Sequence, residues 1–562
     1  MSPGLPGGHA APPPPHHGPK QERMRLLELL RRESKVSPRS LFFVAALAGL
    51  SNAMVLAVIN VAASKAAHHE TSTRLLILFI IAVSVYAIGL KHFMVTSITE
   101  VEKILDKVRI RLADKIRRCD LGPLEEIGRT RIYAGISKET TTISQAAMTL
   151  VWGASASILI LFTAVYVLWL SPLAFLLTGV SAFFIAVAFT RRNKELNLEL
   201  HETMKRENYL FDTLTDILEG FKEVRLNRKR SDDLYDHFEE ISHEATSLKI
   251  QTMVKISTGF ILAQVAFYLL LAVIVFVVPR MSNTYSEQVV KITTAVLFLA
   301  GPLSSVMATI PTLAGANAAV ENIDWLESAL DSCVSARVER LPQRRTFREI
   351  SMESVVFRYE DPSGASFTVG PIDLKIRSGE IVFIAGGNGS GKSTFLKLLT
   401  ALYFPQQGVI RLDGKALTPR TYDAYRSLFA TVFSDFHLFA RLYGLYDVPV
   451  EEIDRRLDLI ELTGKTRVVD SAFDTLELSG GQRKRLALLI SMLEDRSIYV
   501  FDEVAADQDP GFRRKFYMEL IPMLKSAGKT VIAVTHDDKY FGDADRLLKM
   551  DEGRFVSDDQ LV

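Results

Sequence analysis

The segment Gly386–Ser393 constrains the fold of this chain more than any other part of the sequence. It matches the pattern G-x-x-x-x-G-K-[ST], in which a glycine-rich loop wraps nucleotide phosphates with its backbone N–H groups. Glycines are needed because phosphate oxygens approach the main chain closely, where a Cβ atom would collide. An apolar run at 380–385 precedes the loop and a helical pattern at 394–402 follows it. The segment therefore predicts a strand, a loop and a helix whose N-terminus faces the phosphates.

The residues of this loop have predicted roles in binding ATP and Mg²⁺. Lys392 supplies a positive charge to the outer phosphates, and the hydroxyl of Ser393 ligates Mg²⁺. The other loop residues that we expect to contact the nucleotide are Gly386, Gly387, Asn388, Gly389, Ser390, Gly391 and Thr394.

Two later apolar strands end in residues that suit phosphoryl transfer. The strand at 498–501 leads into Asp502 and Glu503, and the strand at 530–535 leads into His536. We expect Asp502 to hold Mg²⁺ and Glu503 to orient or deprotonate the attacking water. An imidazole at His536 can hydrogen-bond the γ-phosphate. The catalytic residues predicted for ATP hydrolysis are Glu503, His536 and Lys392.

Six apolar stretches precede the nucleotide motifs, and none of them contains Asp, Glu, Lys or Arg. Most approach the roughly 20 residues needed to cross a bilayer core. The second and fourth are shorter, so we expect them to continue into flanking helix. Because a proton-driven transporter normally keeps an ionisable residue in the membrane, the energy source must lie in the phosphate loop instead. The stretches lie near 41–63, 75–90, 147–170, 173–189, 260–278 and 292–313.

The distribution of Lys and Arg predicts the orientation in the membrane. The residues before 41, and the segments 91–146 and 191–257, are rich in both types, whereas 64–74 contains only Lys65 and Arg74. By the positive-inside rule, both termini are cytoplasmic. The two long inner segments are helical in pattern and predict cytoplasmic arms. Their irregular points, 121–128 and 218–221, either touch the nucleotide half or are simple loops.

These patterns predict a domain division. Residues 1–22 form a Pro/Gly/His-rich tail, which we expect to be disordered. Residues 23–330 form the transmembrane domain, 331–347 a linker, and 348–562 the nucleotide-binding domain. The net charge of +1 and the lack of a basic stripe interleaved with aromatic residues argue against nucleic acid as a partner.

The order of the motifs resembles an ATP-binding cassette domain, and the specific element is the signature Leu478–Gln482. The whole chain is similar to a half-size exporter. The resemblance implies an all-α six-helix transmembrane domain followed by an α/β P-loop cassette domain. More narrowly, the segments 434–439, 482–488 and 505–510 resemble the bacterial cyclic-peptide exporter family, whose members export nonribosomal peptides and siderophore precursors.

The resemblance also implies roles for residues outside the phosphate loop. Tyr359 would stack on the adenine ring, and Asp509 would communicate across a dimer. Ser434 occupies the position where cassettes usually carry a glutamine that joins the Mg²⁺ shell; serine is too short to act identically. The signature residues that would meet the nucleotide held by another subunit are Ser479, Gly480, Gly481 and Gln482.

The chain contains one phosphate loop and one signature, so the resemblance implies a homodimer with two shared ATP sites. The predicted function is ATP-driven export of a peptide natural product across the cytoplasmic (inner) membrane, with a siderophore precursor among the candidates. The partners are a second copy, a peptide-like cargo and membrane lipid. A lipid or multidrug flippase of the same architecture remains the alternative, and a membrane ATPase that signals without transport is the weaker one.

Overall fold

The computed structural model describes residues 25–34, 37–67, 69, 72–277, 279, 289–333, 346–360 and 366–560. The predicted tail, and most of the predicted linker, lie outside these residues. The described chain divides into two compact units. One is helical and lies within residues 25–114 and 130–328. The other contains residues 115–129 together with the described residues from 329 onward.

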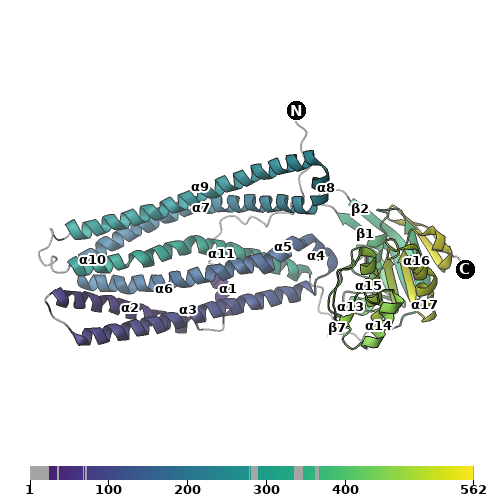
Figure 1. Cartoon of the computed structure of the whole chain (residues 1–562), viewed down its shortest axis with the longest axis horizontal. Helices are drawn as coiled ribbons and strands as arrows, with labels where there is room; N and C mark the ends of the chain where they lie inside the picture. Colours follow the sequence, from purple (N-terminus) through teal and green to yellow (C-terminus); the bar gives the residue numbers. More distant parts are fainter. Residues whose placement is uncertain are drawn as a thin grey trace. The chain divides into compact units, whose positions relative to one another are not determined.

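The helical unit is built from long helices, drawn in purple to teal in Figure 1. α3 and α7 are 44 and 48 residues long. Each continues far beyond its apolar stretch, towards the side that the sequence predicts to be cytoplasmic. The two short stretches therefore continue into flanking helix, as predicted. α7 and α9 lie side by side (Figure 1). The helices up to the last membrane segment are α1 (Arg25–Glu33), α2 (Pro38–Ala67), α3 (Thr73–Ile116), α4 (Leu121–Ile127), α5 (Arg129–Tyr133), η1 (Ala134–Glu139), α6 (Thr140–Leu170), α7 (Pro172–Glu219), α8 (Phe221–Leu226), α9 (Arg228–Ala272), η2 (Val273–Val277), α10 (Val289–Phe298) and α11 (Ala300–Cys333).

Within the described residues, five helical segments are long and apolar enough to cross a membrane, where the sequence predicted six. The difference is the stretch at 173–189, which forms the start of α7. Its described apolar part, Pro172–Phe184, is shorter than a span, and the remainder lies among side chains that the structure does not describe. The five segments are Arg39–Ala66, Thr73–Ile116, Arg129–Leu170, Arg228–Val277 and Val289–Cys333.

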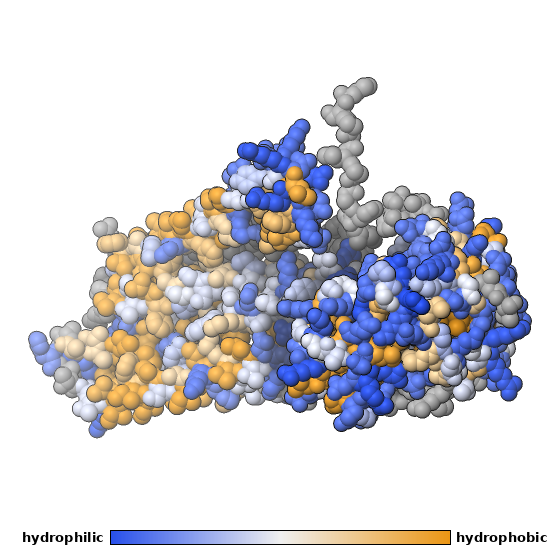
Figure 2. All heavy atoms as spheres, turned by 45° about the vertical axis from the view of Figure 1, so that its right-hand side comes forward, coloured by the Kyte–Doolittle hydropathy of each residue, from blue (hydrophilic) through white to orange (hydrophobic). Residues whose placement is uncertain are grey.

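Large apolar side chains cover much of the surface of the helical unit, where orange predominates over the left-hand part of Figure 2. Phe43 is 69% exposed, Ile88 71% and Trp169 80%. A water-soluble domain rarely exposes a contiguous apolar surface of this extent. The helical unit is therefore suited to a lipid environment, whereas the second unit presents mainly polar side chains (Figure 2).

Two sheets form the framework of the second unit. The larger has the strand order β12-β11-β3-β10-β9-β6, and all of its neighbouring pairs are parallel except β11 with β12. The smaller is antiparallel, with the order β2-β1-β4-β5. The strands are β1 (Glu349–Glu360), β2 (Ser366–Arg377), β3 (Ile381–Gly386), β4 (Gln407–Leu412), β5 (Lys415–Ala416), β6 (Phe429–Val432), β7 (Val468–Val469), β8 (Ala472–Phe473), β9 (Ile498–Asp502), β10 (Thr530–Val534), β11 (Arg546–Asp551) and β12 (Arg554–Gln560).

The central strands are buried on both faces, which explains their continuous apolar sequences. Along β3, Phe383 belongs to one core cluster, whereas Val382 and Ile384 belong to another. β9 alternates in the same way, with Phe501 in the first cluster and Val500 in the second. Because successive side chains of a strand point to opposite faces, each strand supplies both cores. Besides α4, the described helices of this unit are α12 (Lys392–Leu399), α13 (Tyr422–Arg426), α14 (Val450–Leu459), α15 (Gly480–Leu493), α16 (Pro510–Lys515), η5 (Phe516–Leu520), α17 (Ile521–Ser526) and η6 (Asp538–Asp543).

Candidate nucleotide-binding site

Three adjacent parallel strands end at the same edge of the larger sheet. β3 leads into the phosphate loop, β9 ends at Asp502, and β10 lies between them and leads towards His536. In open α/β sheets, ligands bind in the crevice at the carboxyl ends of the strands. The strand order thus gathers the predicted catalytic residues, which are far apart in the sequence.

The phosphate loop has a backbone that only glycine tolerates at several positions. Gly389 has φ +78° and Gly391 has φ +101°, both in the left-handed region. At Gly386, an added Cβ would lie 2.3 Å from the carbonyl oxygen of Met550. Among the residues that the structure describes, the buried hydroxyl of Ser390 has no hydrogen-bond partner. A polar atom of this kind suits a loop that receives a ligand oxygen.

The ammonium group of Lys392 is held against this loop by the main chain. Lys392 is 6% exposed, and its Nζ donates to the carbonyl oxygens of Gly386 (3.0 Å) and Gly387 (2.9 Å). Because an ammonium group has three donors, one remains available for a phosphate oxygen. Of the other predicted contacts, Asn388 is exposed in the loop and Thr394 lies in the first turn of α12.

Two hydroxyl groups converge on the buried carboxylate of Asp502. Ser393 Oγ donates to Asp502 Oδ2 at 3.0 Å, and Ser434 Oγ donates to the same oxygen at 3.1 Å. Mg²⁺ in nucleotide sites is typically bound by one or two carboxylates with substrate phosphates and water. Asp502 and Ser393 fit this donor set. The contact from Ser434, which is 68 residues away, was not anticipated from the sequence.

Glu503 and His536 are brought into direct contact. His536 Nε2 lies 3.1 Å from Glu503 Oε1. Glu503 has φ +53°, a conformation that side-chain-bearing residues seldom adopt and that is often found at functional sites. Its backbone is fixed on both sides, since its N–H donates to Val534 O (3.2 Å) and its carbonyl accepts from Lys484 Nζ (3.2 Å). A carboxylate held this way can orient a water molecule and accept its proton.

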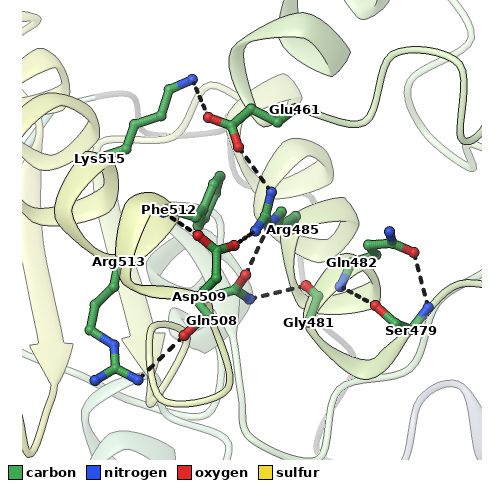
Figure 3. A network of polar contacts seen from close by, with 10 residues as sticks. All are labelled: Glu461, Ser479, Gly481, Gln482, Arg485, Gln508, Asp509, Phe512, Arg513 and Lys515. Carbon is green, nitrogen blue, oxygen red and sulfur yellow. Dashed lines mark hydrogen bonds and ion pairs between the residues drawn. The ribbon is translucent and has the colours of Figure 1, made fainter.

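The signature begins helix α15 through a capping box (Figure 3). The Ser479 hydroxyl accepts from the Gln482 N–H at 3.4 Å, and the Gln482 side chain accepts from the Ser479 N–H at 3.1 Å. These contacts satisfy helix-terminal donors and fix the shape of the loop. Gly480 and Gly481 form the first turn, so their N–H groups lie at the helix N-terminus, where an anion is favoured.

The segment around Asp509 is bound to this signature helix by side chains (Figure 3). Gln508 donates to Gly481 O at 3.0 Å and accepts from Arg485 Nε at 2.8 Å. Arg485 also pairs with Asp509 and lies 3.9 Å above the ring of Phe512. The Phe512 N–H, and then Arg485, lower the pKa of Asp509 below its usual range. The sequence did not predict that Arg485 connects the signature helix to the segment around Asp509.

Tyr359 lies near the end of β1, paired with Phe367 of β2, and is 48% exposed. Its exposure leaves a ring face available for stacking. Among the described residues, no hydrogen bond joins signature residues 479–482 to phosphate-loop residues 386–394. The structure thus brings together the predicted Mg²⁺ ligands and catalytic residues, and separately the signature and Asp509.

Comparisons with known proteins agree with this architecture. Residues 369–506 match the family model described as ABC transporter, whose domain binds ATP. ATP-binding protein SyrD of Pseudomonas syringae pv. syringae is 33% identical, over 96% of this chain and 98% of that protein. An ATP-dependent lipid A-core flippase of Alkalilimnicola ehrlichii is 29% identical over 52% of each. A bacterial Atm1-family ABC exporter, solved with ATP bound, has a TM-score of 0.75 at 18% identity, covering 95% of this chain and 96% of its own. The chain therefore belongs to the ABC transporter family and has the fold of its exporters.

Proposed function

We propose that this chain is one half of a homodimeric exporter that uses ATP hydrolysis to move a peptide-like cargo out across the cytoplasmic membrane. The observation that carries the proposal is the contact between Glu503 and His536, 3.1 Å apart, beside the Asp502 carboxylate. The same chain has, within its described residues, five helical segments long and apolar enough to cross a membrane. Hydrolysis and membrane passage are thus supported within a single polypeptide.

In the proposed reaction, Glu503 accepts the proton of the attacking water. His536 holds the Glu503 carboxylate in place and forms a hydrogen bond to the γ-phosphate. Lys392 neutralises charge on the outer phosphates. Asp502 and Ser393 would hold Mg²⁺, which supplies further charge neutralisation at the phosphate oxygens. The water oxygen bonds to the γ-phosphorus while the bond from this phosphorus to the bridging oxygen breaks and ADP leaves, and the proton of the water ends on a Glu503 carboxylate oxygen.

We infer a dimer because the signature and the phosphate loop described for one chain do not meet in a single site. The signature presents a helix N-terminus that suits a γ-phosphate, but within the described residues it makes no hydrogen bond to the phosphate loop of its own chain. A second copy related by two-fold symmetry would complete two equivalent sites. ATP then joins the two cassettes, and its breakdown releases them. Alternation of the membrane helices between inward- and outward-facing states would convert this cycle into transport.

The peptide cargo is supported by the three segments that resemble the cyclic-peptide exporter family, 434–439, 482–488 and 505–510. Lipid remains the second candidate, because ATP-dependent lipid A-core flippases match about half of the chain. The two candidate cargoes can be distinguished by whether each one stimulates ATP hydrolysis by the chain in nanodiscs. A cyclic peptide should raise the rate and lipid A should not; the reverse result would favour a flippase.

The test of the function uses the full chain in sealed liposomes with a fluorescent cyclic peptide as probe. Glu503→Gln should lower ATP hydrolysis at least about 10²-fold, because general base catalysis typically contributes this much. Peptide flux should fall with it. Glu519→Gln, an exposed glutamate of the same unit, is the control and should leave both rates unchanged. ATP turnover by the unaltered chain without flux of either peptide or lipid would indicate a non-transporting ATPase instead.

A further inference from the structure

Glu503, the base in the proposed reaction, has a backbone conformation that depends on its surroundings. Its φ of +53° lies in the left-handed region, where a residue with a side chain persists only when neighbouring contacts fix it. The Glu503 N–H donates to Val534 O at 3.2 Å, and the Ala506 N–H donates to the Glu503 carbonyl at 3.3 Å. Val534 ends the neighbouring strand β10, and Ala506 lies three residues further along the same turn. These two contacts are local to the sheet edge.

A third contact to Glu503 comes from Lys484 of α15, the helix that begins at the signature. Lys484 Nζ donates to Glu503 O at 3.2 Å and pairs with Asp507 Oδ2 at 2.5 Å. The ammonium group therefore connects both ends of the turn 503–507 to the signature helix. The Lys484 side chain is 13% exposed, so the cation is held between helix and turn rather than extended into solvent.

An ion pair that only stabilises the fold is the simpler interpretation of Lys484. Asp507 is 66% exposed, however, and ion pairs with an exposed partner contribute little to stability. The contact with Glu503 is of another kind, because it is a charge-assisted hydrogen bond to a main-chain carbonyl. Lys484 thus acts on the orientation of one peptide group of the proposed base, and Asp507 anchors the ammonium group that does so.

The orientation of this peptide group determines where the Glu503 carboxylate lies. The carboxylate extends from the same residue, with Oε1 3.1 Å from His536 Nε2. A general base must lie within hydrogen-bond reach of the proton that it accepts. A displacement of about 1 Å can lower a rate about 10²-fold. Because neither partner of Lys484 belongs to the phosphate loop, we expect this lysine to affect the rate of hydrolysis rather than the affinity for ATP.

We propose that Lys484 is a positioning residue for ATP hydrolysis, which holds Glu503 in the left-handed conformation that directs its carboxylate at the attacking water. This inference rests on the proposed function, in which Glu503 is the base, and it adds a residue of the signature helix to that reaction. Lys484 transfers no proton and acts through Glu503.

The experiment compares ATP hydrolysis by full-length variants in nanodiscs, with kcat, the KM for Mg-ATP and the melting temperature measured on each preparation. Lys484→Met keeps an unbranched side chain and removes the ammonium group. It should lower kcat at least about fivefold and leave KM within about twofold of the unaltered chain, because the base is displaced while the phosphate loop is intact. Lys484→Arg restores a cation with several donors and should recover most of the lost rate.

Lys529→Met is the matched control. Lys529 Nζ donates to Asp495 Oδ1 at 2.7 Å, and its side chain is 19% exposed, so its pairing and burial resemble those of Lys484. Its partner precedes β9 instead of following it, and this variant should retain both kcat and KM. If Lys484→Met folds poorly, Asp507→Asn weakens the same anchor from an exposed position and should lower kcat to a smaller extent at constant KM.

A double-mutant cycle separates a positioning role from a structural one. Lys484→Met is combined with Glu503→Gln, and the residual hydrolysis is followed in single-turnover reactions. A residue that acts through the base loses its effect once the base is removed, so the second substitution should change the residual rate less than about twofold. An equal proportional loss in both backgrounds, or an unchanged kcat in Lys484→Met, would overturn the positioning role alone. Full hydrolysis by Glu503→Gln with Lys484 intact would overturn the assignment of the base, and the positioning role with it.

Discussion

At the residue scale, a few side chains around Asp502 make up the predicted Mg²⁺ site. The buried carboxylate of Asp502 accepts from two serines, one in the phosphate loop and one after β6. The sequence predicted Ser393 as an Mg²⁺ ligand, and it predicted that Ser434 would act differently from the usual glutamine. In the structure the Ser434 hydroxyl donates to Asp502, and this hydrogen bond can hold the carboxylate in position.

Ser434→Ala should therefore weaken Mg²⁺ binding more than it slows the reaction. A hydrogen bond to a charged group contributes about 1.5–3 kcal/mol, so the Mg²⁺ concentration for half-maximal ATPase should rise at least about tenfold. Mg²⁺ titration of the ATPase rate measures this. Ser427→Ala, whose hydroxyl donates to Ala424 O at 2.7 Å, is the control. An unchanged half-saturation in Ser434→Ala would show that the serine does not position Asp502.

At the scale of elements, the membrane helices pack closely where one of them carries glycine. Gly153 of α6 faces Thr309 of α11, and a Cβ at Gly153 would lie 2.0 Å from Thr309 Oγ1. The threonine is held in place, because its hydroxyl donates to Ser305 O at 2.9 Å. Small residues at such contacts let membrane helices approach each other.

Gly153→Ala should lower the thermal stability of the full-length protein in detergent, since overpacking typically costs about 1–3 kcal/mol. Thr309→Ala in the same chain should recover part of the loss by removing the nearest atoms. Gly259→Ala is the comparison, because a Cβ at Gly259 would have no described atom within 4 Å apart from its chain neighbours and the backbone of its own helix. Equal melting temperatures for Gly153→Ala and Gly259→Ala would contradict the packing argument.

At the scale of the whole molecule, the proposed dimer makes each ATP site depend on two chains. A cassette that supplies the phosphate loop to one site supplies the signature to the other. This arrangement predicts complementation between two inactive variants, which no site contained within one chain would allow.

Lys392→Ala and Gly481→Asp should each abolish ATP hydrolysis as homodimers. Co-expressed with different affinity tags, they form mixed dimers in which one site has both intact parts and the other has neither. The purified mixed dimer should recover about one half of the unaltered activity, because each mixed dimer has one of its two sites intact. Activity is measured after tandem purification of the mixed dimer. Absence of any recovery would exclude a shared site.

Local sequence patterns determined much of this protein. The phosphate loop, the buried strands that end at Gly386 and Asp502, the signature helix and the arms that continue from α3 and α7 were all predictable, because glycine spacing, apolar runs and charge act over short stretches. The number of membrane spans was harder to predict, because the apolar part of α7 is short and is followed by polar residues in the same helix.

Only the tertiary structure decided which distant side chains meet. His536 contacts Glu503 across 33 residues, Ser434 reaches Asp502 across 68, and Tyr403 reaches Glu125 across 278. The order of strands in the sheet and the docking of α4 set these contacts. Both arise from burial of apolar surface between elements, which is non-directional and leaves no local signature in the chain.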